Sequence, residues 1–245
     1  MSEFLMVLLL AAMPALGNFS GGLLAEWINV SEKTLNLALH FAAGIILAVV
    51  GLELMPTALE VEQPWIPIAA FMGGGFTFLL LEKAVHFIKD RFGGEGKATG
   101  SAWGIYLGVA IDLFSDGIMI GTGSTVSVSL GLLLALGQVP ADIPEGFATI
   151  ATFKSKGVPK KMRYLLAAGF TIPILLGATI GFWTMRNSGD LIKFSLLAFT
   201  AGILLSVAIE EILTEAHGKP DPVYASVLLT SGFSLFALLT VYLEG

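Results

Sequence analysis

Four acidic residues stand at helical spacing inside two apolar segments. Asp112 and Asp116 are four residues apart in one segment, and Asp142 and Glu145 are three apart in the next. On a helix, either spacing places both carboxylates on one face. A carboxylate within a bilayer is costly unless it pairs, takes up a proton or meets a cation. No lysine or arginine lies within either segment, so the pattern favours a divalent cation held by oxygen ligands.

Residues near these acids could line the same path. Pro140 and Pro144 each remove a backbone hydrogen bond, so we expect a kink and carbonyls without helical donors. Irregular backbone at membrane depth is tolerated where it lines a cavity. Gln138, Met119 and Thr149 lie close enough along the chain to be pathway or gate residues. The simpler interpretation, that the acids are inert and wetted at helix ends, applies more to the Asp142 turn than to the mid-segment acids of the first segment.

The composition is that of a membrane protein. The chain has 245 residues, of which 55% are hydrophobic and 13% charged, and its mean hydropathy is +0.84. A soluble domain carries about 25% charged residues. The net charge of -6 offers no basic surface for nucleic acid. With no cysteine and three histidines, thiolate metal sites and cysteine nucleophiles are excluded, and any metal must be bound mostly by oxygen.

Eight stretches are long and apolar enough to cross the hydrocarbon core, which takes about 20 residues each. We therefore expect a single all-α integral membrane domain over residues 1–245 with eight transmembrane helices. The acidic start, Met-Ser-Glu, is unlike the basic start of a signal peptide, so the first span is expected to be retained. The expected spans are about 4–24, 36–56, 65–85, 103–123, 127–153, 162–184, 191–213 and 222–243.

The basic residues predict the orientation of these spans. The odd-numbered loops and their flanks hold eleven of the 13 lysines and arginines, and the even-numbered loops hold only Arg186 and Lys193. Positive charge favours the cytoplasmic side. We therefore expect the odd loops in the cytoplasm and both termini outside, in the cytoplasmic membrane of a prokaryote. The lipid bilayer is the expected environment, and a second copy of the chain, as a homodimer, is a candidate partner.

A repeated sequence indicates internal symmetry. Phe41-Ala-Ala-Gly-Ile-Ile-Leu-Ala-Val is similar to Phe199-Thr-Ala-Gly-Ile-Leu-Leu-Ser-Val, and Glu53 and Glu211 follow at the same distance. The two copies lie on spans of opposite direction, which is typical of inverted-repeat transporters. We expect spans 1–3 and 6–8 to form the repeats around spans 4 and 5. Glu53 and Glu211 would then be gate residues at the two mouths. Chance likeness of Ala/Gly-rich helices is the alternative.

The motifs of spans 4 and 5 resemble those of the ZIP (Zrt/Irt-like) family of divalent metal transporters. That family carries His-Asn-x-x-Asp/Glu-Gly in span 4 and His-x-x-Pro-x-Glu or His-Asn-x-Pro-Glu-Gly in span 5. Here the corresponding runs are Asp112-Leu-Phe-Ser-Asp-Gly and Ala141-Asp-Ile-Pro-Glu-Gly. The resemblance implies a metal transporter, not an enzyme, with eight spans and both termini outside. The implied metal ligands are Asp112, Asp116, Asp142 and Glu145.

The histidines of the family motifs are replaced here by Asp112 and Ala141, and the asparagine of span 4 by Leu113. Carboxylate and water ligands suit manganese better than imidazole does. We therefore expect the transported metal to be zinc, manganese or iron, with a preference shifted from zinc toward manganese or ferrous iron. Three alternatives remain open: a proton- or sodium-linked carrier of the same fold that has lost metal transport, an intramembrane aspartyl protease, and a receptor that binds a cation without moving it.

Overall fold

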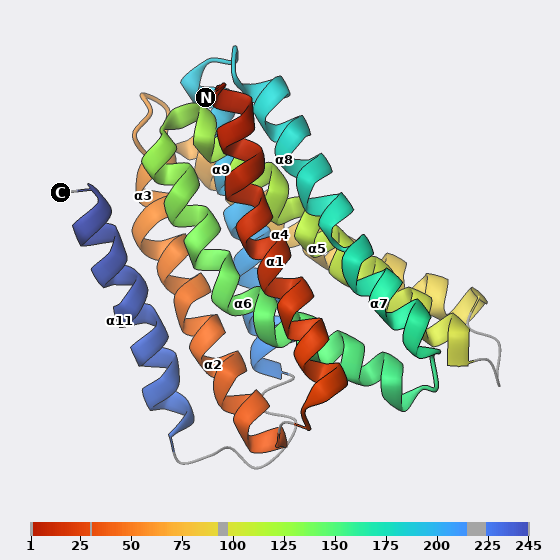
Figure 1. The fold of residues 1–245 in the computed structure, drawn as a ribbon. Coiled ribbons are helices and arrows are strands. Elements are labelled where there is room, and N and C mark those ends of the chain that lie inside the picture. The colour runs from red at the N-terminus through yellow and green to blue at the C-terminus, as the bar shows by residue number, and fades with distance from the viewer. Residues whose placement is uncertain (1, 30, 93–97, 215–223, 245) are drawn as a thin grey trace.

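The computed structural model describes residues 2–29, 31–92, 98–214 and 224–244, and in these residues the protein is helical apart from short turns (Figure 1). Two segments, η1 and η2, are π-helical. The elements are α1 (Glu3–Trp27), α2 (Glu32–Ala48), η1 (Val49–Leu54), α3 (Met55–Ala58), α4 (Trp65–Phe92), α5 (Ala98–Val126), α6 (Val128–Ser155), α7 (Lys160–Gly169), α8 (Thr171–Met185), α9 (Asp190–Ser206), η2 (Val207–Leu213) and α11 (Ala225–Glu244).

These elements form the expected membrane spans, because α2 continues through η1 into α3, α7 into α8, and α9 into η2. Among the described residues, seven helices are long and apolar enough to cross a membrane. The remaining long helix, α6, has 28 residues, but Gln138, Asp142 and Glu145 lower its hydropathy. The predicted all-α membrane fold is confirmed.

Three serines begin helices in the way that the backbone requires. The first N–H groups of a helix have no partner within it, and a serine side chain can accept from one of them. Ser2 accepts from Leu5 at the start of α1, and Ser127 accepts from Leu130 at the start of α6. Ser31 caps α2 through Thr34. Each cap fixes where a span begins, and hence the register of the side chains that follow.

The helices pack in four close pairs: α1 with α6, α5 with α8, α2 with α11, and α4 with α9 (Figure 1). Glycines allow this approach, since a Cβ on Gly44 would collide with the Leu229 carbonyl and one on Gly202 with the Phe71 carbonyl. The hydrophobic effect does not drive helices together within a bilayer, so small residues matter there because they let helix backbones pack closely. Exchanging span 1 for 6, 2 for 7, 3 for 8 and 4 for 5 converts these pairs into one another. The packing therefore follows the symmetry of the inverted repeat.

The two π-helical segments occupy equivalent places in the repeats. Each begins eight residues after the phenylalanine of its copy, η1 after Phe41 and η2 after Phe199. π-Helical turns are rare and often mark functional positions. Glu53 lies in η1 and Glu211 in η2; the side chain of Glu211 lies outside the described residues.

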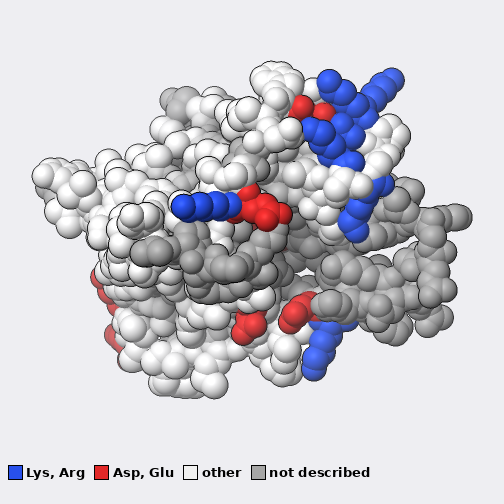
Figure 2. Space-filling model, turned by 90° about the horizontal axis from the view of Figure 1, so that it is seen from below, with Lys and Arg blue, Asp and Glu red and all other residues white. Residues whose placement is uncertain are grey.

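Basic side chains gather at one end of the molecule, which Figure 2 views directly. The junction of α6 and α7, at the lower end of Figure 1, carries Lys154 and Lys160. A buried ion pair crosses this end, since the Arg163 guanidinium of α7 donates to the Glu26 carboxylate of α1, with its second contact at 2.8 Å. The lysine at the end of α6 also donates to the Ala25 carbonyl at 3.3 Å. The ends of α1, α6 and α7 are thereby held together.

The packing of α2 on α11 can be tested with Gly44→Ala. The added methyl group would meet the Leu229 backbone, so we expect a loss of about 1–3 kcal/mol, as for other overpacked cores. The measurement is thermal unfolding of the purified protein in detergent. Gly108→Ala on α5 is the matched control, because a Cβ there meets nothing within 4 Å. Equal unfolding temperatures for the two variants would contradict the close packing of α2 on α11 at Gly44.

Candidate functional site

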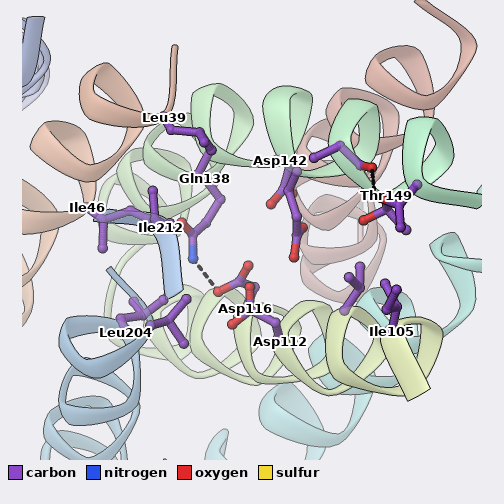
Figure 3. Close-up of a pocket in the computed structure, with 16 residues that line it drawn as sticks. Leu39, Ile46, Ile105, Asp112, Asp116, Gln138, Asp142, Thr149, Leu204 and Ile212 are labelled. Atoms are coloured by element: carbon purple, nitrogen blue, oxygen red, sulfur yellow. Dashed lines mark hydrogen bonds between the residues drawn. The ribbon is translucent and has the colours of Figure 1, made fainter. Parts of the chain in front are cut away.

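A cavity of about 270 Å³ lies between α5 and α6 and reaches α2, α9 and η2. Its walls are mixed, with aliphatic side chains from α2 and α9 facing polar ones from α5 and α6 (Figure 3). The described residues that line it are Leu39, Ile46, Ile105, Val109, Asp112, Asp116, Gln138, Ala141, Asp142, Glu145, Ala148, Thr149, Thr152, Leu204, Val207 and Ile212. No lysine or arginine is among them.

All four predicted ligand residues line this cavity. Asp112 and Asp116 come from α5, and Asp142 and Glu145 come from α6. In Figure 3, Asp116 and Asp142 point toward one another across the space between the two helices. Both side chains are 2% exposed, whereas Asp112 and Glu145 are partly accessible from the cavity. The helical spacing of each pair therefore directs two carboxylates from each helix into one space.

Neutral carboxamides contact two of these acids. Gln138, itself buried, donates through Nε2 to Oδ1 of Asp116 (Figure 3). Asn18 of α1 donates through Nδ2 to Oε2 of Glu145 at 3.0 Å. Asp142 differs, because its Oδ2 is buried and has no hydrogen-bond partner among the described residues. Such an acceptor requires a proton, a water molecule or a cation.

The carboxylates line a wide space and do not form a closed coordination shell. Among the described residues, no three His, Cys, Asp or Glu side chains lie close enough together to hold a metal ion. A site of this kind differs from a structural metal site, in which the ligands surround the ion on all sides. An open set of oxygen ligands would suit an ion that must both enter and leave the site.

The predicted pathway residues fall into different places. Gln138 and Thr149 line the cavity. Met119 does not, since its side chain is fully buried in the hydrophobic core. Glu53 is also buried away from the cavity lining, where the Thr240 hydroxyl donates to it at 3.5 Å. The side chain of Glu211 lies outside the described residues.

The two prolines of α6 do not interrupt the helix, which runs from Val128 to Ser155 through both of them. The helix therefore continues through the two positions at which we expected a kink. Because proline has no N–H, the carbonyls of Leu136 and Pro140 lose the donor that the next helical turn would supply. These carbonyls belong to the stretch of α6 that carries the site.

Asn18 is the residue of the site that the sequence interpretation missed. Its side chain is 1% exposed, although it bonds to a residue 127 positions later in the chain. The signal was present, because Asn18 is the one carboxamide in the first span, where Ser20 is the other polar residue. A polar side chain at membrane depth is expected to have a partner. Its spacing along α1 alone does not identify that partner.

Comparison with known proteins places this geometry in context. A sequence model of the ZIP zinc transporter family matches residues 95–240. The chain is 28% identical to the zinc transporter ZupT of Chlorobium limicola, over 98% of this chain and 99% of that protein. It is 26% identical to ZupT of Streptococcus mutans, over 86% of this chain and 88% of that protein. Zinc transporter ZIP13 of Pongo abelii is 25% identical, over 84% and 67% respectively.

The missing partner of Asp142 leads to a stability prediction. We expect Asp142→Asn to stabilise the cation-free protein by about 1–3 kcal/mol, because it replaces an ionisable group, buried beside other acids and with an Oδ2 that has no partner among the described residues, by a group of the same shape that can never carry a negative charge. Thermal unfolding in a chelating buffer measures this change. Glu62→Gln is the control, since it makes the same kind of change on an exposed loop. A destabilised or unchanged Asp142→Asn protein would contradict the prediction.

Proposed function

Because the chain belongs to the ZIP family of divalent metal transporters, we propose that it carries divalent cations through the carboxylate site between α5 and α6. The supporting observation is that Asp112, Asp116, Asp142 and Glu145 line one cavity without a basic residue among its described lining. A divalent cation supplies the positive charge that this cavity lacks. In this proposal the four carboxylates bind the cargo, and Gln138 and Thr149 line its path.

The oxygen-rich lining supports a broadened choice of metal. The relatives are named zinc transporters, and zinc is accordingly the first expected cargo. Zinc binds well to imidazole, whereas manganese and ferrous iron accept sites made of carboxylate and water. No histidine is among the described residues that line the cavity. We therefore propose transport of manganese or ferrous iron alongside zinc.

We also propose that residues 1–245 form one transport domain in the cytoplasmic membrane of a prokaryote. The pairing of α2 with α11 supports one domain, because it joins the early and late parts of the chain. The similarity to transporters from bacteria supports the proposed location in a prokaryotic cytoplasmic membrane. Three further points stay predictions. They are the homodimer, the roles of Glu53 and Glu211 as gates, and the role of Met119 beside the path.

Transport by purified protein in lipid vesicles tests the function. We expect uptake of Mn²⁺ and Zn²⁺ by the unaltered protein, and loss of uptake in Asp116→Ala and Glu145→Ala, because each removes a carboxylate from the cavity. Glu62→Ala, which alters an exposed acid outside the cavity, should transport normally.

Three results would contradict parts of this proposal. Unchanged flux in both alanine variants would refute the site. Zinc binding without manganese flux would refute the broadened preference. Flux that persists after complete metal removal and follows pH or sodium would favour the carrier that has lost metal transport.

The proposed orientation, with both termini outside, can be tested with single cysteines, since the native chain contains none. We expect a membrane-impermeant maleimide to label Glu62→Cys on intact cells. Lys161→Cys should be labelled only after permeabilisation, because the basic junction of α6 and α7 is expected in the cytoplasm. Both positions are exposed, so accessibility in the folded protein does not separate them. The opposite labelling pattern would show that both termini lie in the cytoplasm and would contradict the proposed orientation.

A further inference from the structure

Another cavity, of about 360 Å³, lies at the end of the molecule where α1 begins, at the top of Figure 1. It is formed by the start of α1, the turn between α5 and α6, and the end of α8. It shares no described lining residue with the carboxylate site, so the two cavities are separate. Its polar lining residues are Glu3, Ser124, Thr125, Ser127 and Arg186.

Two basic side chains meet at this cavity. Arg186 and Lys193 are the basic residues of the even-numbered loops, which the proposed orientation places outside the cytoplasm. The preference of basic residues for the cytoplasmic side therefore does not account for them. Arg186 lines the cavity, and Nζ of Lys193 donates to the carbonyl of the lining residue Thr125 at 3.3 Å. A lysine ammonium has three donors, so this contact leaves two for a ligand. Together the two side chains suit an anionic group such as a phosphate.

The same cavity offers oxygen acceptors. The hydroxyls of Ser124 and Thr125 each donate to a carbonyl of α5 at 2.7 Å, and their oxygens keep lone pairs that can accept hydrogen bonds. Glu3 adds an exposed carboxylate to the lining. A primary ammonium group donates up to three hydrogen bonds, and its bonds to a carboxylate are strengthened by charge. The lining therefore suits a ligand that carries both a phosphate and a primary amine.

Aromatic side chains indicate that the cavity lies at the level of the lipid headgroups. The Arg186 guanidinium lies 4.7 Å from the ring centroid of Trp183, whose side chain is 53% exposed. Phe4 of α1 packs against the same indole ring, with 5.6 Å between the ring centroids. Tryptophan is enriched where the hydrocarbon core meets the headgroups. An exposed tryptophan on a membrane span faces lipid, so a lipid headgroup can reach the arginine beside it.

We propose that this cavity binds the headgroup of a phospholipid with a primary amine, as in phosphatidylethanolamine. The phosphate is bound by Arg186 and Lys193. The ammonium group is bound by Glu3 and by the hydroxyl oxygens of Ser124 and Thr125. Phosphatidylcholine has the same phosphate, but its quaternary nitrogen has no N–H to donate, so it binds less tightly. The inference does not depend on the proposed function, because it involves no residue of the carboxylate site.

Lipid binding to the purified full chain in detergent tests the inference. Short-chain phosphatidylethanolamine and phosphatidylcholine are the probes, and calorimetry measures the affinity for each. We expect the unaltered protein to bind phosphatidylethanolamine about tenfold more tightly, the scale of one hydrogen bond to a charged group. Glu3→Ala should lose most of this preference, because it removes the carboxylate that meets the ammonium group. Arg186→Gln should weaken the binding of both lipids about tenfold, because it removes a charged donor to the phosphate.

Matched controls alter exposed charges outside the cavity. Glu62→Ala and Lys161→Gln should keep the native affinities and the native preference. If Arg186→Gln does not yield folded protein, Lys193→Gln tests the other contact to the phosphate. It should likewise weaken both lipids.

Three results would overturn the inference. One is unchanged lipid binding when the positive charge at Arg186 is removed. Another is competition by inorganic phosphate at the same concentration as the lipid, which would assign the cavity to a free anion. The third is a Glu3→Ala protein with native lipid binding but weaker Mn²⁺ binding, which would make the cavity an entrance for the cation.

Discussion

Carboxylates buried without basic partners are the constraint on which the rest of this structure depends. Asp116 and Asp142 are almost fully buried and face a cavity whose described lining contains no lysine or arginine. In a soluble protein, water could hydrate such groups at a small cost in free energy. Within a bilayer, their charge must be balanced by a cation or removed by a proton. The fold stabilises this arrangement largely through helix contacts away from the cavity, such as those of α1 with α6 and of α5 with α8. Hydrogen bonds from Asn18 and Gln138 then orient two of the acids.

Those helix contacts are short because glycine permits them. The two helices that carry the acids each have a close partner outside the site, α1 for α6 and α8 for α5. On the site helices, Gly146 lies against the Asn18 carbonyl and Gly117 against the Ile174 carbonyl. Both glycines directly follow an acid of the site, Glu145 and Asp116 respectively. Close backbone packing thus fixes each acidic turn from the side opposite the cavity.

The spans and the repeat could be predicted because a bilayer requires long apolar helices, and the acids stood out because charged residues are rare within such helices. Each apolar run must become a helix, and helical spacing then decides which acids share a face. What could not be predicted is which residue of another helix each side chain meets. Met119 lies three residues from Asp116, yet it packs in the hydrophobic core. Asn18 lies far from the acids in sequence, yet it contacts Glu145. Both outcomes depend on the rotation and depth of neighbouring helices, which the pattern of a single span does not contain.

The neutral donors beside the acids agree with the proposed function, because a cation-transport site must keep the negative charge of its carboxylates. A lysine in place of Gln138 could donate to Asp116 equally well, but its fixed positive charge would cancel the charge that attracts a cation. A carboxamide orients the carboxylate and leaves its charge in place. Asn18 stands in the same relation to Glu145. Orientation without neutralisation is the property that both contacts share.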